Sequence, residues 1–267
     1  MTKDTRSIPL WPAYEIAAML LGLGAFALLC LLWLPLAVLA SRLLPSRSGQ
    51  WLGRTVARVA FRGYLGFLGT FCACRFDLSE LDRLRDDGPL ILAANHPSLL
   101  DAVFILSRVP NTVCVMKAAL MDNPLLGAAA RLARFIRNDP PLAMFLEAGE
   151  ELAAGTRLLI FPEGTRTRDF PLQACQSSTA LLARRSKVAV QTLLIEFSTP
   201  YLGKHWPLFR RPELPLVCRV RLGRRFNPPQ NVSAFTAELE SYLRSELAAT
   251  AADDHAVSPR HDSAHAL

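Results

Sequence analysis

The hydrophobic positions follow one pattern before residue 73 and another after it. Residues 16–41 contain no charged side chain and are mostly Leu, Ala, Val and Phe, which predicts one long apolar helix. At about 1.5 Å per residue such a helix is about 40 Å long, against about 30 Å for the hydrocarbon core of a bilayer. Residues 51–71 place apolar side chains at helical spacing and predict an amphipathic helix. Residues 1–72 are therefore interpreted as a membrane anchor made of a hydrophobic helix pair.

After residue 73, short apolar runs alternate with amphipathic stretches. The runs predict strands at residues 90–94, 112–116, 157–161, 188–197 and 216–222. The amphipathic stretches predict helices at residues 99–107, 125–134, 141–153, 177–185 and 233–247. This alternation is typical of the α/β class, so residues 73–247 are expected to form a mixed sheet covered by helices. Residues 248–267 are small and polar, lack periodicity, and are expected to be a disordered tail.

The apolar helix is also compatible with a secretory signal, which residues 38–40 would allow to be cleaved. Its length exceeds the usual signal core, Glu15 precedes it directly and arginines follow it, so a retained anchor is favoured. The arginines that follow are Arg42, Arg47, Arg54, Arg58 and Arg62. Their excess places the α/β domain on the cytoplasmic face of a membrane, which we expect to be a bacterial inner membrane.

Two features of the anchor leave alternatives open. Pro35, Gly22 and Gly24 allow a bent helix that enters one leaflet without crossing. Arg54, Arg58 and Arg62 form one stripe, which suits an interfacial helix with its arginines at lipid phosphates. An ordinary helix packed on the domain with a solvated arginine face fits the same pattern.

Composition narrows the class of protein. The chain is 51% hydrophobic and 20% charged, which excludes a disordered chain and a coiled coil. A formal net charge of +7 suits anionic lipid or nucleic acid alike. The six cysteines include no CxxC pair and no accompanying His cluster, so neither a metal site nor a disulfide framework is expected.

The first chemical motif directly follows a predicted strand and reads Asn95-His96-Pro97-Ser98-Leu99-Leu100-Asp101. His96 and Asp101 meet only if the chain turns between them, and Pro97 with an N-capping Ser98 provides a turn. A carboxylate on one imidazole nitrogen leaves the other nitrogen free to take a hydroxyl proton. The alternative is structural, because Ser98 and Asp101 are also spaced as a capping box.

The second motif also leaves a predicted strand and reads Phe161-Pro162-Glu163-Gly164-Thr165-Arg166-Thr167-Arg168. Gly164 permits a positive φ and close approach of backbone amides to an anion. Arg166 offers a planar fork of donors for phosphate, and Glu163 either orients that fork or hydrogen-bonds an acceptor hydroxyl. By itself the motif is equally typical of a surface turn with a Glu–Arg pair.

In this order, and behind a membrane segment, the two motifs resemble those of the glycerolipid acyltransferases, which include the 1-acylglycerol-3-phosphate and lysophospholipid acyltransferases. The resemblance covers residues 51–229. It implies that His96 is the general base and Asp101 its orienting partner. The residues that it assigns to acceptor binding are Lys117, Arg137, Glu163, Gly164, Thr165 and Arg166. For Lys117 an exposed residue at a strand end is the alternative.

Two segments depart from the family pattern. The chain reads Ala174-Cys175-Gln176-Ser177 where the family has Phe-Lys-x-Gly, and its late strand lacks the Pro-Val pair. Both segments are expected to line the substrate region, which leaves the acceptor open. Gln191 and Thr192 either hydrogen-bond a different head group or are satisfied polar residues of a buried strand.

The resemblance implies a membrane-bound O-acyltransferase. It would move a fatty acyl group from acyl-CoA or acyl carrier protein to the free hydroxyl of a lysophospholipid, 1-acylglycerol-3-phosphate, giving phosphatidic acid. No metal or redox cofactor is implied. The alternatives are a related acyltransferase for an aminolipid or a polyene-type lipid, and a non-catalytic lipid-binding membrane protein.

Residues 201–211 are basic and aromatic, and include Lys204, Trp206, Arg210 and Arg211. Such interleaving is found in nucleic-acid binders. Beside a membrane anchor, a loop with Trp206 at the level of the lipid headgroups is favoured, and no nucleic-acid partner is expected.

Overall fold

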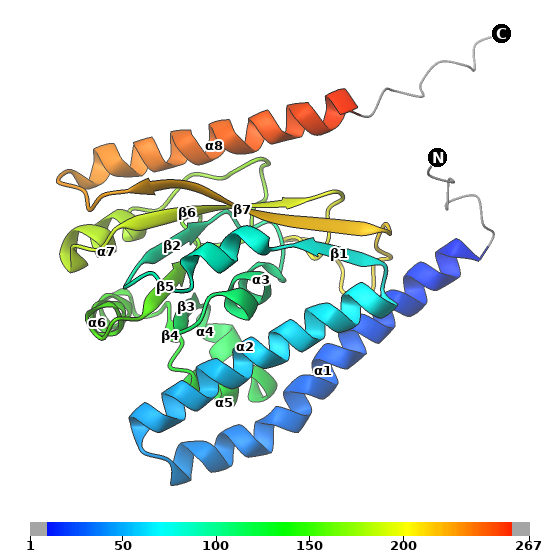
Figure 1. Ribbon diagram of the computed structural model, residues 1–267, viewed down its shortest axis with the longest axis horizontal. Helices are drawn as coiled ribbons and strands as arrows, with labels where there is room; N and C mark the ends of the chain where they lie inside the picture. The colour runs from blue at the N-terminus through cyan, green and yellow to red at the C-terminus, as the bar shows by residue number, and fades with distance from the viewer. Residues whose placement is uncertain (1–9, 258–267) are drawn as a thin grey trace.

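The protein folds around one seven-stranded sheet with helices on both faces, as Figure 1 shows for the computed structural model, which describes residues 10–257. The strands lie in the order β1-β7-β6-β2-β5-β3-β4. Their bounds are β1 Cys74–Asp77, β2 Ile91–Ala94, β3 Thr112–Met116, β4 Ile136–Arg137, β5 Arg157–Ile160, β6 Val190–Phe197 and β7 Leu216–Phe226. Strands β6, β2, β5, β3 and β4 are parallel, whereas β7 is antiparallel to β6 and parallel to β1. The predicted mixed α/β sheet is confirmed.

The burial of each strand follows from its place in the sheet. All residues of the central strands β2 and β5 are buried, because parallel strands are covered on both faces. The first half of β7 alternates buried and exposed residues, as a strand with one open face does. The five parallel strands end at one edge of the sheet, called here the carboxyl edge, and the loops that follow β2, β3, β5 and β6 meet there.

The helices form two layers around the sheet. On one face lie α2 (Ser46–Phe71), α3 (Asp101–Arg108) and the 3-10 helix η2 (Ser79–Leu84), with α1 (Trp11–Leu43) packed against α2. The other face is covered by α6 (Pro141–Ala153), α7 (Ser178–Ser186) and α8 (Val232–Val257). The short helices α4 (Ala118–Met121) and α5 (Pro124–Leu132) follow β3, and α5 packs on α1 and α2.

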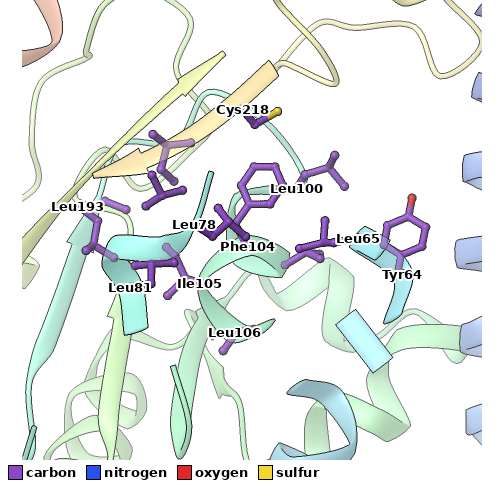
Figure 2. Packing of buried hydrophobic residues seen from close by; sticks show 14 of the residues in the cluster. Tyr64, Leu65, Leu78, Leu81, Leu100, Phe104, Ile105, Leu106, Leu193 and Cys218 are labelled. Atoms are coloured by element: carbon purple, nitrogen blue, oxygen red, sulfur yellow. The ribbon is translucent and has the colours of Figure 1, made fainter. Parts of the chain in front are cut away.

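A hydrophobic core fills each layer, because successive residues of a strand point to opposite faces. In β2, Leu92 and Ala94 belong to the core beneath α2 and α3, whereas Ile91 and Ala93 belong to the core beneath α6 and α8. Figure 2 shows the first of these cores, in which the fully buried ring of Phe104 lies among aliphatic side chains from several elements. Its position fixes α3, and therefore the turn that precedes α3, on the sheet.

Every predicted strand and helix is present, with ends shifted by a few residues. Among the described residues, the elements that escaped prediction are β1, β4, η2 and α4, each of six residues or fewer. The prediction for the carboxyl end was wrong in part, because α8 extends to Val257 and residues 248–257 are helical. The rest of the expected tail, residues 258–267, lies outside the described residues, as do residues 1–9 of the expected anchor.

Helix α1 packs on the protein along one face and leaves the other open. Gly22 lies in contact with α2, where Tyr64 donates a hydrogen bond to the Gly22 carbonyl at 3.2 Å. Towards the other end, the fully buried Ala37 packs against Leu132 of α5. The outer face carries side chains that are more than half exposed, namely Leu20, Leu28, Leu31, Leu32, Leu36 and Leu39. By length and composition α1 is able to cross a membrane.

The three arginines of the predicted stripe, Arg54, Arg58 and Arg62, have different environments, so neither the interfacial nor the solvated interpretation holds for the whole stripe. Arg54 is 9% exposed, and its Nη2 forms a 2.7 Å ion pair with Glu151 of α6 while Nε donates to the carbonyl of Ala133. Arg58 and Arg62 remain at the surface and line a cavity of ≈ 410 Å³. Arg54 therefore joins α2 to the domain and is neither an interfacial nor a solvated residue.

Candidate active site

The two sequence motifs meet because β2 and β5 are neighbours in the sheet, with Ala93 beside Ile160. The first motif leaves β2 and the second leaves β5, both at the carboxyl edge. Lys117 follows β3 and Arg137 ends β4, so they lie at the same edge. Open parallel sheets bind their ligands outside the carboxyl ends of the strands. The sequence-predicted residues therefore share the edge where a site is expected.

His96 and Asp101 form a close pair. Nδ1 of His96 lies 2.7 Å from Oδ2 of Asp101, and the same oxygen accepts the Ser98 backbone N–H at 2.8 Å. Asp101 thus orients the imidazole and also ties down the turn before α3. Oγ of Ser98 accepts the N–H of Leu100 inside that turn, and α3 begins at Asp101, so the prediction of Ser98 as the N-cap was wrong. The side chain of His96 is 18% exposed, which leaves Nε2 as the nitrogen available to a substrate.

The environment of Asp101 sets its charge. The side chain is fully buried, and this burial raises the pKa of Asp101 to about 6, while the hydrogen bonds from His96 and Ser98 oppose the shift. The carboxyl is therefore ionised at neutral pH. An ionised carboxylate on Nδ1 holds the tautomer in which Nε2 carries a lone pair.

The ring and the backbone of His96 are both held by the second motif. The imidazole stacks on Phe161, with ring centroids 3.8 Å apart and planes 13° from parallel. The backbone N–H of His96 donates to Oε1 of Glu163 at 2.9 Å, and the His96 carbonyl accepts the N–H of Thr167 at 2.7 Å. The two motifs thus form one structural unit around the imidazole.

Glu163 is the buried centre of this unit and is 3% exposed. Besides the N–H of His96, Oε1 accepts the hydroxyl of Thr167 at 2.8 Å, and Oε2 accepts the N–H of Gln173 at 3.1 Å. The contacts of the carboxylate are therefore with loops, whereas the sequence suggested contacts with Arg166 or an acceptor. Gly164 has φ +68°, and a Cβ there would lie 3.3 Å from the Gln176 side chain, so glycine suits this position for two reasons.

Arg166 joins the second motif to the loop after β6. Its Nη1 donates to the carbonyls of Leu202 at 2.8 Å and Gly203 at 2.6 Å. Burial lowers the pKa of Arg166, but the guanidinium remains protonated at neutral pH. These bonds occupy one of its two terminal nitrogens, and the planar group lies beside the turn that carries His96.

A lysine that sequence reasoning did not assign to the site lies next to Thr165. Lys204, in the loop after β6, donates a hydrogen bond from Nζ to the hydroxyl of Thr165. Burial and the positive charges of Arg168, Lys117 and Arg166 lower the pKa of Lys204, so these cations lie near one another. The basic stretch 201–211 was the only sign of Lys204 in the sequence. Where that stretch lies in the fold depends on where β6 ends, at Phe197.

Arg137 lies at the carboxyl edge but faces a different partner. It sits beside Met116 in the sheet, one residue before Lys117. Its Nη1 and Nη2 bind both carboxylate oxygens of Asp122 at 2.7 and 3.1 Å, in a pair that is 42% and 60% exposed. The structure thus brings Lys117, Arg166 and Lys204 together and leaves the fork of Arg137 on Asp122.

Two further polar positions are structural. Gln191 donates to the carbonyl of Gly223, and Thr192 donates to the carbonyl of Arg224, so both are satisfied within a buried strand pair, as the simpler interpretation held. Asn95 has a role that the sequence did not indicate. Its amide bonds both the N–H and the carbonyl of Ile195 at 2.7 and 2.9 Å, which extends the β2–β6 ladder by a side chain.

A family model and several known proteins match parts of this chain. Residues 75–196 match the family model described as Acyltransferase. The 1-acyl-sn-glycerol-3-phosphate acyltransferase of Limnanthes douglasii is 29% identical over 162 residues, which cover 58% of this chain and 55% of that protein. The human 1-acyl-sn-glycerol-3-phosphate acyltransferase beta is 26% identical over 73% of this chain and 76% of its own length. The chain thus spans about half of the plant relative and about three quarters of the human one.

Two other comparisons extend this picture. The lyso-ornithine lipid O-acyltransferase of Brucella abortus (strain 2308) is 29% identical over 60% of this chain and 70% of that protein. The crystal structure of the 1-acyl-sn-glycerophosphate acyltransferase PlsC from Thermotoga maritima superposes with a TM-score of 0.65 at 19% identity, covering 90% of this chain and 98% of that one. At this identity the superposition establishes the fold.

The fold and the paired motifs thus define an acyltransferase domain. More particularly, the comparisons support the glycerolipid acyltransferase family for the matched part of the chain.

Proposed function

We propose that the protein is a membrane-bound O-acyltransferase that transfers a fatty acyl group from a thioester donor to the free hydroxyl of a lysophospholipid. The observation that carries the proposal is the His96–Asp101 pair, in which a buried carboxylate binds Nδ1 at 2.7 Å. This pair lies at the carboxyl edge beside a cluster of cations, Lys117, Arg166 and Lys204. A base next to an anion-binding surface suits an acceptor that carries a hydroxyl and a phosphate.

The reaction follows from the geometry of the pair. Nδ1–H of His96 donates to Asp101, and Nε2 takes the proton from the acceptor hydroxyl as its oxygen attacks the thioester carbonyl carbon. The tetrahedral intermediate then expels the thiolate, which recovers the proton from the imidazolium. Asp101 stabilises that imidazolium by its negative charge. No Ser or Cys nucleophile is needed, because the acceptor alcohol attacks directly.

The acceptor that suits the site best is 1-acylglycerol-3-phosphate, with phosphatidic acid as the product. Two of the relatives described above carry that activity in their names. A phosphate monoester carries about −1.5 to −2 charges at pH 7, which matches several neighbouring cations. A lyso-ornithine lipid is the second candidate, since the Brucella relative is named for it. Acyl-CoA or acyl carrier protein supplies the acyl group in either case.

The membrane part of the proposal rests on α1. Its outer leucines are more than half exposed, a state that favours contact with lipid. Near one end Glu15 accepts the N–H of Leu214, and near the other Ala37 packs on Leu132. Because both ends hold the domain, we place α1 in one leaflet on the cytosolic side, with residues 73–247 as the catalytic domain. Leu214 lies in the loop after β6, and Leu132 lies in α5, which follows β3. Both segments are at the carboxyl edge, so the proposed anchor lies along that edge.

The test is acyl transfer by membranes that contain wild-type or His96→Ala protein. Labelled acyl-CoA and acyl carrier protein are the donors, and lysophosphatidic acid and lyso-ornithine lipid are the acceptors. Loss of the base is expected to reduce transfer by at least about 100-fold. His205→Ala is the matched control, since His205 is exposed and has no part in the proposed chemistry. Equal transfer by wild-type and His96→Ala protein would refute the mechanism, and transfer to lyso-ornithine lipid alone would favour the second acceptor.

A further inference from the structure

The loop after β6 crosses directly over the turn that carries His96. The carbonyl of Leu202 accepts two hydrogen bonds, from the backbone N–H of Leu99 at 3.2 Å and from Nη1 of Arg166 at 2.8 Å. At Gly203 a Cβ would lie 3.5 Å from the carbonyl oxygen of Pro97, so the two backbones are in close contact. Both motifs of the site therefore hold this loop in place.

The backbone of the loop turns sharply at Leu202. Its φ is +51°, a left-handed conformation that residues with a Cβ adopt only rarely. The two hydrogen bonds on its carbonyl and the burial of its side chain hold this conformation. The turn directs the next side chains back across the carboxyl edge, and Lys204 reaches the hydroxyl of Thr165 in the second motif.

The surroundings of Lys204 are strongly positive. It is half-buried, and its neighbours include Lys117, Arg166 and Arg168. Within residues 10–250, no carboxylate forms an ion pair with Lys204, Lys117 or Arg166. By contrast, Arg137 at the same edge forms an ion pair with Asp122. Like charges held together without a counter-charge repel one another, and a bound anion removes that repulsion.

We infer that Lys204 is a specificity-determining residue, which binds the phosphate monoester of the acceptor together with Lys117 and Arg166. The loop after β6 is then one wall of the headgroup site, and Arg166 acts in part by fixing this wall through the carbonyls of Leu202 and Gly203. The inference rests on the proposed acyl transfer for its substrate. It assigns selectivity for a phosphate-bearing acceptor over a neutral one to a residue outside both motifs.

The experiment compares full-length Lys204→Gln with wild type, using 1-acylglycerol-3-phosphate and 1-acylglycerol as acceptors. The loss of a charged donor is expected to raise KM for the phosphate acceptor about tenfold or more and to change kcat about threefold at most. The kcat/KM for 1-acylglycerol should stay unchanged, and Lys204→Arg should restore the low KM. Lys187→Gln is the control, because it removes an exposed lysine before β6, at the opposite edge of the sheet.

Binding of glycerol 3-phosphate without a donor, measured by calorimetry, separates this inference from the proposed reaction. Weaker binding by Lys204→Gln, with Lys187→Gln unchanged, supports the assignment even if wild type transfers no acyl group, in which case the proposed function fails alone. Three outcomes overturn the assignment. The first is an unchanged KM in Lys204→Gln, and the second is an equal loss of kcat/KM with both acceptors. The third is glycerol 3-phosphate binding that is absent, or equal in wild type and Lys204→Gln.

Discussion

Glu163→Gln tests whether Glu163 positions the base or binds the acceptor. The carboxylate accepts three hydrogen bonds, from the N–H of His96, the hydroxyl of Thr167 and the N–H of Gln173. A glutamine amide has one acceptor oxygen, so in its better orientation the NH₂ group faces the N–H of Gln173 and one bond is lost. The other two bonds lose the negative charge of their acceptor. A hydrogen bond to a buried charged group contributes about 1.5–3 kcal/mol, so about 2 kcal/mol of stability should be lost.

The expected result separates stability from catalysis. For a chain of this size a loss of about 2 kcal/mol lowers Tm by roughly 4–8 °C, measured by thermal unfolding in detergent. Because the backbone of His96 also loses its anchor, kcat should fall about 10- to 100-fold at temperatures where the protein is folded. KM for the acceptor should change little. A rise in KM with unchanged kcat would refute the positioning role and favour direct contact with the acceptor.

Thr167→Val is the matched control for this experiment. It removes one hydrogen bond to the same oxygen of Glu163 and leaves the charged carboxylate and its bond to His96 in place. The loss of this bond to a buried charge should lower stability by about 1.5–3 kcal/mol, similar to Glu163→Gln, but with a small effect on kcat. A loss of kcat as large as that of Glu163→Gln would show that general loosening of the loop, and not the bond to His96, is responsible.

Two further predictions concern the charge of Asp101 and the exposed face of α1. Burial raises the pKa of Asp101 from 3.8 to about 6, so kcat/KM should fall as pH drops through about 6. The stability that this carboxyl contributes has the opposite dependence, because it is present at low pH and is lost as pH rises through about 6. This fall of kcat/KM at low pH should therefore occur while the protein stays folded. Asp101→Asn should react much more slowly and show no such fall. A fall of kcat/KM that coincides with loss of the circular dichroism signal would contradict this. Leu32→Glu with Leu36→Glu puts two charges on the exposed face and should release the protein from phospholipid vesicles in a flotation assay, whereas unchanged flotation would exclude this face as the anchor.

The central part of the site could be predicted from sequence because its signals are local. The turn between His96 and Asp101 is specified by Pro97 and by spacing, and the structure has that turn. A strand before each motif predicted that both leave the sheet at one edge, as they do. The structural and the orienting interpretations of Asp101 were treated as alternatives, whereas one carboxylate oxygen both binds the Ser98 N–H in the turn before α3 and orients His96.

The remaining features depend on contacts between distant segments, which periodicity does not encode. Lys204 reaches Thr165 only because Leu202 adopts a left-handed turn under Arg166. Arg54 belonged to a regular stripe of arginines in the sequence, but Glu151 from α6 lies opposite it and makes it an internal ion pair. The guanidinium of Arg137 binds Asp122, which lies in the turn between α4 and α5.

A ribosome makes α1 and α2 before any strand of the sheet, because they precede β1 in the chain. The site closes only when the loop bearing Lys204 reaches the two motifs, and that loop is made after β6. At about 5–20 residues per second, roughly 7 to 27 seconds separate the end of α2 from the last site residue, Lys204. On the proposed function, the order of synthesis therefore lets the nascent chain attach to the bilayer first and complete its catalytic site there, next to the proposed lipid acceptor.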